Sequence, residues 1–275
     1  MRRFAATVLG ASVAMIALCG CADAESDAQE ASVSAEAAEQ STVHAFWSTY
    51  RDANRLRLAG DLEGAADGYR AALQYAPDHQ DALYYLGNVL LELRRFDEAL
   101  DSWRRLRAVA PEGARAHRRI GDVFSCLDEP ALVDLDSAYA SYRRAFNINK
   151  EETGSLIRLG EISLLQGRLE DARRYFSAVR SANEESLEAL LLGGYVQWQS
   201  GHPDDGRMLF DEARSRVKPL PDSTRFSAEG DTKSGAAMTR DADLCRPFQR
   251  FTNDLRTVED PAVLYGRIRT LLDAV

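Results

Sequence analysis

The chain has 275 residues, of which 45 % are hydrophobic and 28 % are charged, which is ordinary for a soluble globular protein. Its 18 glycines and 8 prolines are too few for a fibrous or low-complexity protein, and beyond the N-terminus no apolar run is long enough to span a bilayer. The formal net charge of −9 argues against nucleic acid as a partner.

Residues 1–20 have the layout of a secretory signal. Arg2 and Arg3 precede an uncharged apolar stretch that ends in small residues. The stretch runs into the letters LCGC, which resemble the bacterial lipobox, where Leu and a small residue precede a cysteine that is acylated. The resemblance implies that Cys21 is the lipidated N-terminus of the mature chain. Plain signal-peptidase cleavage and an uncleaved anchor are the alternatives.

This signal predicts a location in the bacterial cell envelope. Acyl chains on Cys21 would anchor the protein in a membrane leaflet without spanning it. Ala22 follows the cysteine, which resembles the outer-membrane class because Asp there is the usual inner-membrane retention signal. We therefore expect the periplasmic face of the outer membrane if the source is Gram-negative. Removing residues 1–20 leaves 32 basic and 43 acidic residues, a net charge of −11.

Residues 21–43 are predicted to form an acidic tether. Between Ala22 and Thr42 there are seven Ala, four Ser and six carboxylates, with no basic, aromatic or Pro residue. Such a segment cannot bury enough surface to fold alone, and its like charges extend it. The alternative is that part of the Ala/Glu run is helical.

From residue 44 to residue 218 the sequence repeats with a period of 34. Sliding the chain against itself by 34 residues superposes small residues on small ones and aromatic residues on aromatic ones. One step is 39 residues instead, so five residues are inserted near 128–133. The matched sets are Ala65 and Ala99; Tyr69 and Trp103; Pro77 and Pro111; Gly87 and Gly121; Ala138, Ala172 and Gly206; and Tyr142, Phe176 and Phe210.

These residues resemble the tetratricopeptide repeat, whose pattern has Leu-Gly in a first helix, Ala-x3-aromatic in a second, and Pro after it. The resemblance implies an all-α solenoid of five antiparallel helix pairs, in which Gly or Ala lets the two helices approach and an aromatic ring fills the space opposite. Gly60, Gly167 and Gly201 lie between the paired helices, where a left-handed residue ends the first one. The repeats are predicted at about 44–77, 78–111, 112–150, 151–184 and 185–218.

The C-terminal part departs from the repeat. Residues 219–243 contain Pro, Ser, Thr and Gly without periodicity and are predicted to be a loop. Residues 244–275 carry two apolar helical patterns, which we expect to form two helices capping the last repeat, although a separate partner-binding hairpin is the alternative. The apolar set of the fifth repeat is either packing or the receptor of that cap; it comprises Leu191, Leu192, Tyr195 and Trp198.

Candidate binding residues lie on the first helices, which in this family line the concave face and bind extended peptides. Guanidinium groups beside Tyr and Asn would suit a carboxylate or an acidic peptide. The alternative is a solvated face with ion pairs to Asp122 and Glu161. The candidates are Tyr84, Tyr85, Asn88, Arg115, Arg118, Arg119 and Arg158.

The sequence offers little for catalysis or metal binding. Its four histidines fall in different repeats, and no metal-binding, P-loop or nucleophile motif occurs in the folded body, so we expect no enzyme activity, cofactor or metal. Cys126 and Cys245 could form a disulfide in an oxidising envelope compartment, or Cys126 could be a small buried residue.

The leading hypothesis is therefore a membrane-anchored scaffold that binds protein or peptide partners on its concave face. A glycan- or small-molecule-binding accessory lipoprotein that uses aromatic side chains on that face is the second hypothesis. An enzyme with an unrecognised site is the third. The sequence identifies neither the partner, nor the envelope process, nor the oligomeric state.

Overall fold

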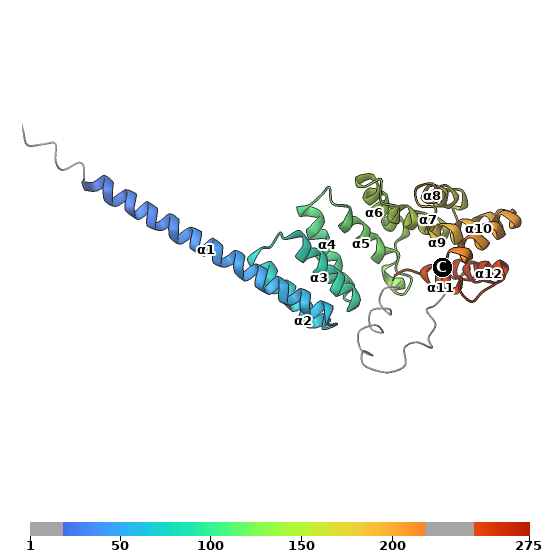
Figure 1. Cartoon of the computed structure of the whole chain (residues 1–275), viewed down its shortest axis with the longest axis horizontal. Helices are drawn as coiled ribbons and strands as arrows, with labels where there is room; N and C mark the ends of the chain where they lie inside the picture. Colours follow the sequence, from blue (N-terminus) through green and yellow to red (C-terminus); the bar gives the residue numbers. More distant parts are fainter. Residues whose placement is uncertain (1–18, 218–244) are drawn as a thin grey trace, which may run out of the picture.

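The computed structural model describes residues 19–217 and 245–275, which form helices and connecting segments (Figure 1). Most of the predicted signal and the predicted loop at 219–243 lie outside this part. The helices are α1 (Cys19–Leu58), α2 (Leu62–Tyr75), α3 (Gln80–Glu92), α4 (Phe96–Val109), α5 (Ala114–Phe124), the 3-10 helix η1 (Pro130–Leu132), α6 (Leu135–Ile148), α7 (Gly154–Leu165), α8 (Leu169–Ala182), α9 (Leu187–Gln199), α10 (Pro203–Arg216), α11 (Gln249–Asp254) and α12 (Pro261–Asp273).

Helices α1 to α10 form five consecutive pairs. Each helix packs against the one before it and the one after it, and α11 and α12 lie beside α9 and α10 at the C-terminal end (Figure 1). This arrangement confirms the predicted all-α solenoid of five helix pairs with two C-terminal helices.

The paired helices approach where glycines of the first helix face aromatic rings of the second. A Cβ on Gly121 would lie 2.9 Å from the ring of Tyr142, and one on Gly160 would lie 2.6 Å from Phe176. Both rings are fully buried. The close approach expected from the repeat pattern therefore sets the distance between the helices of these pairs.

The turns inside the repeats use left-handed residues. Gly60, Gly167 and Gly201 have φ values of 81°, 69° and 85°, as their position between the helices predicts. The second repeat places Arg94 at the same point, 34 residues after Gly60, and its φ is 58°. A side chain is disfavoured in this region, so Arg94 is locally strained.

Two asparagines end second helices where the repeat proline is missing. Asn149 follows α6, and its side-chain oxygen accepts a hydrogen bond from the N–H of Glu151 at 3.2 Å. Asn183 follows α8 and accepts from the N–H of Glu185 at 3.1 Å. These Asx turns give the backbone a local alternative to the helix and therefore stop it without proline.

The segment expected to be an unfolded tether is helical instead. Helix α1 runs unbroken from Cys19 to Leu58 and projects from the repeats (Figure 1). Its C-terminal part, from Phe46, packs as the first helix of the first repeat. Because that packing already supplies a helical nucleus, each further Ala, Glu or Gln adds a backbone hydrogen bond at little cost. The segment need not bury a core of its own to be helical.

The five-residue insertion forms η1 and is linked to the C-terminal region. The chain between α5 and α6 turns through η1, where the sequence places the extra residues. Beside it, Cys126 and Cys245 form a disulfide across 119 residues, and the N–H of Cys245 donates to Asp128 at 3.3 Å. Both cysteines are buried. The sequence left open whether Cys126 is bonded to Cys245 or is simply a small buried residue, and the structure has the disulfide.

The C-terminal helices extend the core of the last three repeats. Tyr265 of α12 lies 6.0 Å from Tyr195 and 5.8 Å from Trp198, ring to ring, and its hydroxyl donates to the carbonyl of Gly206 at 2.8 Å. The first of the two helices, α11, covers only Gln249–Asp254, which is shorter than the apolar pattern suggested. The apolar surface of α9 is therefore the receptor of the C-terminal region.

Candidate functional site

The first helices of the repeats present a common surface, which we call the first-helix face. Successive repeats place equivalent side chains on it, such as Tyr85, Arg119 and Arg158. On α3 and α5 these positions are partly exposed, whereas every residue of Ser155–Leu164 in α7 and of Ala189–Val196 in α9 is buried. We call the part on α1, α3 and α5 the open half and the part on α7 and α9 the covered half.

Tyr84 is the centre of the open half. The guanidinium carbons of Arg115 and Arg119 lie 4.9 and 5.8 Å from the centroid of its ring, and Arg119 donates to its hydroxyl at 3.3 Å. Burial alone would raise the pKa of Tyr84, but the charge of Arg119, with hydrogen bonds from Asn88 and Arg119, holds it below its usual value. The ring is thus held in place by the two arginines, and the residue remains partly exposed.

The three candidate arginines of α5 each have a carboxylate partner. Arg115 pairs with Asp81 at 2.9 Å and Arg118 with Glu152 at 3.0 Å, both across adjacent repeats. Arg119 pairs with Asp122 on its own helix at 3.2 Å. The surface is therefore close to neutral, and an acidic ligand would have to compete with these internal carboxylates.

A buried polar network supports Arg119 from below. Asp122 is 5 % exposed and accepts a hydrogen bond from the hydroxyl of Tyr142 at 2.8 Å, while Ser125 lies 3.2 Å from the same hydroxyl. Burial raises the pKa of Tyr142 well above its usual value, and the charge of Asp122 adds to the effect. Arg119 is therefore a positioning residue for Tyr84 rather than a freely available cation.

An aromatic cluster extends the open half onto α1. Tyr50 lies 5.9 Å from Trp47 and 5.8 Å from Tyr69, and Tyr69 stacks on Tyr85 at 6.2 Å. Trp47 is 46 % exposed and lines a surface pocket on α1. Sequence reasoning missed Trp47, although the 34-residue shift places it on Asp81 of the same face.

Arg158 does not lie with the other candidates on the accessible surface. It is 7 % exposed and pairs with Glu161, which is 3 % exposed, in the covered half. Burial raises the pKa of Glu161 to about 7, against the opposing charge of Arg158. The expectation that Arg158 is available to a partner is wrong for this structure, because its side chain is buried and paired with Glu161.

The repeats match known family models in two places. Tetratricopeptide repeat models match residues 56–119 and residues 157–223. The chain belongs to the tetratricopeptide repeat family. No curated protein matches its sequence at a significant level.

Solved tetratricopeptide repeat structures share its fold. PilW, described as a widely conserved type IV pilus biogenesis factor, is 19 % identical with a TM-score of 0.54, over 64 % of this chain and 79 % of PilW. PilF of Pseudomonas aeruginosa is 18 % identical with a TM-score of 0.55, over 66 % and 80 %. YrrB, described as having an unusual peptide-binding site, is 22 % identical with a TM-score of 0.50, over 61 % and 84 %. At these levels of sequence identity the comparisons show a shared fold and nothing about function.

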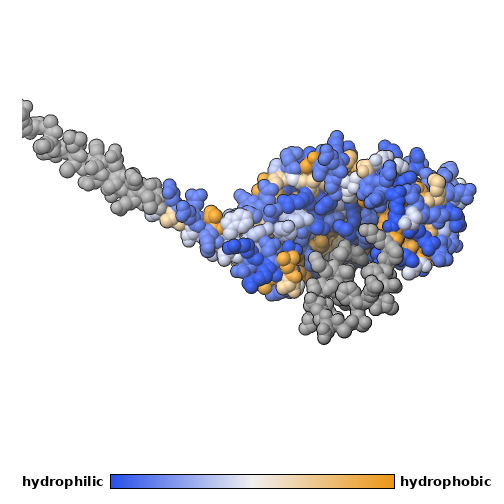
Figure 2. All heavy atoms as spheres, in the orientation of Figure 1, coloured by the Kyte–Doolittle hydropathy of each residue, from blue (hydrophilic) through white to orange (hydrophobic). Residues whose placement is uncertain are grey.

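The surface of this tetratricopeptide repeat protein offers no broad apolar patch in the view of Figure 2, where small hydrophobic areas are separated by hydrophilic ones. Partner binding on the open half would therefore use single aromatic anchors among polar groups, as many protein interfaces do.

The histidines of the tetratricopeptide repeats have separate surroundings. His79 caps α3, its Nδ1 accepting from the N–H of Ala82 at 3.2 Å. His117 has a lowered pKa because of its burial and the nearby Arg107. Within residues 19–217 and 245–275 no three His, Cys, Asp or Glu side chains converge as a metal site.

The predicted anchor falls at the edge of the described chain. Cys21 belongs to the first turn of α1, and the apolar stretch of the signal precedes it, outside the residues that the structure describes. Among the described helices, none is both long and apolar enough to cross a membrane.

Proposed function

We propose that this protein is a lipid-anchored scaffold of the bacterial envelope, which holds a partner protein on the open half of its first-helix face. The repeats themselves make it a protein-interaction scaffold. The observation that carries the binding site is the contrast between Tyr84, accessible and fixed by Arg115 and Arg119, and the equivalent positions of the covered half, which are buried.

The partner segment that suits this face is mixed in character. Rigid tyrosine and tryptophan rings offer contact area at low entropic cost. The paired arginines leave no strong net charge, so selectivity for acidic ligands is not expected. The side-chain oxygen of Asn88 is buried and has no hydrogen-bond partner among the described residues. A backbone N–H of an extended polypeptide would reach this oxygen only after the Asn88 side chain rotates outward, which would give the buried acceptor a partner.

The envelope location is supported by two independent features. The N-terminal signal ends in the lipobox-like LCGC, and the folded body contains the Cys126–Cys245 disulfide, a bond typical of oxidising compartments. Helix α1 adds a spacer. From Cys21 to Phe46 it would hold the repeats about 40 Å from the acylated residue, since each helical residue rises 1.5 Å.

Two experiments test these parts separately. Cys21→Ser is expected to abolish palmitate labelling and to release the protein from the membrane fraction; a labelled, membrane-bound variant would contradict the anchor. For binding, the body lacking residues 1–42 is used to capture partners from envelope extracts. Tyr84→Ala is expected to lose the partner that the control Tyr75→Ala retains, because Tyr75 is exposed at the end of α2. Equal capture by both would contradict the site.

A second candidate function is glycan binding at the N-terminal end of the open half. The exposed ring of Trp47 lies edge-on to Tyr50 and could stack on a sugar ring. Titration with soluble cell-wall fragments tests it. Saturable binding that Trp47→Ala removes would support this function, and the absence of heat at millimolar glycan would exclude it.

A further inference from the structure

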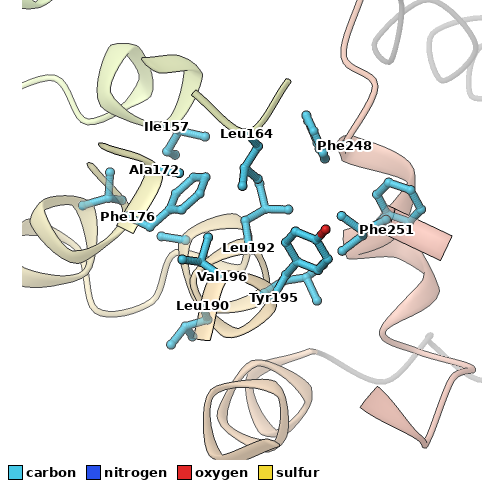
Figure 3. Packing of buried hydrophobic residues seen from close by; sticks show 14 of the residues in the cluster. Ile157, Leu164, Ala172, Phe176, Leu190, Leu192, Tyr195, Val196, Phe248 and Phe251 are labelled. Carbon is cyan, nitrogen blue, oxygen red and sulfur yellow. The ribbon is translucent and has the colours of Figure 1, made fainter. Parts of the chain in front are cut away.

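The covered half is filled by the chain's own residues 245–258, which we call the cover segment. Phe248, Phe251 and Leu255 of this segment are at most 3 % exposed. Figure 3 shows Phe248 beside Leu164 of α7 and Phe251 directed toward Tyr195 of α9. The cover segment thus packs on the first helices α7 and α9, whereas nothing equivalent lies on the open half among the described residues.

The positions that receive the cover segment are repeat equivalents of the open half. Steps of 39 and 34 residues relate Arg119 to Arg158 and then to Leu192, and relate Asp122 to Glu161 and then to Tyr195. In the open half these positions lie at or beneath the accessible surface, whereas in the covered half all four are buried. The fold therefore contains an example of a polypeptide bound to its first-helix face.

The interface under the cover segment is not a purely apolar core. The charge of Arg246 in the segment acts on Glu161, which is buried with Arg158, and one carboxylate oxygen of Glu161 has no hydrogen-bond partner among the described residues. Burying such groups is costly, and apolar residues of similar volume would be more favourable. Charged groups of this kind suit a surface that is sometimes uncovered.

Besides these buried side chains, the cover segment is held at both of its ends. At one end Cys245 is bonded to Cys126, and beyond the other end α12 is anchored by Tyr265, whose hydroxyl donates to Gly206. Between them the only regular structure is the six-residue α11. This tethering gives the segment a high effective concentration at the covered half, and a competing segment must overcome that advantage.

We propose that the covered half is a second docking surface, occupied here in cis, for a partner polypeptide of the same chemistry as the cover segment. That chemistry is two aromatic side chains three residues apart, followed by a leucine four residues later. The proposal rests on the proposed scaffold function but concerns a different part of the first-helix face. Binding there is in competition with the cover segment, so its apparent affinity depends on the fraction of molecules in which the segment is displaced.

The probe that tests the proposal is a fluorescent synthetic peptide of residues 245–258, with Ser in place of the cysteine. It is titrated against the mature chain and against Phe248→Ala/Phe251→Ala, which weakens the cover without altering its receptor. The double variant is expected to bind the peptide at least about tenfold more tightly than the unaltered chain. Met208→Ala, at a 61 % exposed position on α10, is the matched control and should bind as the unaltered chain does.

The controls separate this proposal from others. A peptide with both phenylalanines replaced by alanine should not bind, and Tyr84→Ala in the receptor should leave peptide binding unchanged. Dimers of the double variant in light scattering would support the same docking, supplied by a second copy. If the double variant keeps its helical circular dichroism and binds no better than the unaltered chain, the proposal is wrong. If it does not fold, Cys245→Ser takes its place, and no gain in that variant overturns the proposal.

Discussion

Gly87 of α3 lies directly against the indole of Trp103 of α4, so that a Cβ at position 87 would overlap the ring. Trp103 is fully buried, and its Nε1 donates to the backbone carbonyl of Tyr84 at 3.4 Å. The pair thus sets the separation of α3 and α4 and at the same time supports the residue at the centre of the open half.

Gly87→Ala is expected to lower the free energy of unfolding by about 1 to 3 kcal/mol, because the added methyl group must displace the indole. Alanine alone favours a helix by about 1 kcal/mol over glycine, so the loss comes from the contact. The matched control is Gly266→Ala in α12, where no atom would lie within 4 Å of the new Cβ and a gain of about 0.5 to 1 kcal/mol is expected. Urea denaturation measures both, and a stabilising Gly87→Ala would contradict the packing.

Arg94→Gly is expected to stabilise the protein by about 1 kcal/mol, because it relieves a positive φ that the first, fourth and fifth repeats give to glycine. The gain is reduced by loss of the exposed ion pair with Glu129. Arg94→Ala loses the same pair but keeps a Cβ, so it should be less stable than Arg94→Gly. Thermal unfolding compares them, and equal midpoints would show that the backbone is not strained.

Reduction of the Cys126–Cys245 disulfide is expected to lower the free energy of unfolding by about 2 to 4 kcal/mol, because the bond closes a long loop in the unfolded chain. Cys126→Ser/Cys245→Ser should match the reduced protein and be insensitive to dithiothreitol. Thiol titration of the denatured mature protein provides the check. Two free thiols without reductant would mean that the bond is absent.

Stability should depend on pH through Glu161. Because its pKa rises from 4.5 to about 7 on folding, the folded chain binds this proton more tightly than the unfolded chain. The contribution of Glu161 to stability is therefore full below pH 4.5 and falls as the pH rises through 7. The stability of Glu161→Gln minus that of the unaltered protein should increase by about 3 kcal/mol between pH 4.5 and pH 8.

Glu170→Gln is the control for this titration, because the folded chain leaves that carboxylate largely in water. If the curves of Glu161→Gln and Glu170→Gln run parallel, Glu161 is not the group that titrates.

Much of the fold could be predicted because the repeat is a local pattern. Gly121 opposite Tyr142, and Gly60, Gly167 and Gly201 in the turns, each fulfil a requirement set within one 34-residue unit. For residues 22–42 the unfolded tether was favoured and a partly helical Ala/Glu run was the alternative, because their composition only excludes a core of their own; the structure has the helix along the whole segment. It depends on the packed part of α1, which offers a helix end from which they continue.

The binding site was harder to predict than the fold. Periodicity placed Arg119 and Arg158 on one face, but it does not predict that Arg158 is buried. Nor does it predict that residues 245–258 pack on the covered half, since that packing joins segments far apart in the chain. Spacing likewise left the pairing of Cys126 and Cys245 open. Trp47 was missed because the equivalent positions of the next two repeats hold charged residues, Asp81 and Arg115. Its exposure also depends on the path of α1.

Photo-crosslinking in intact cells tests the central claim most directly. Benzoylphenylalanine replaces Tyr84, on the open half, or Tyr75, which is exposed at the end of α2. If the open half binds a partner, position 84 should yield a discrete adduct that position 75 does not, and mass spectrometry would identify the partner. An adduct at position 75 with none at position 84 would contradict the assignment of the open half as the binding surface.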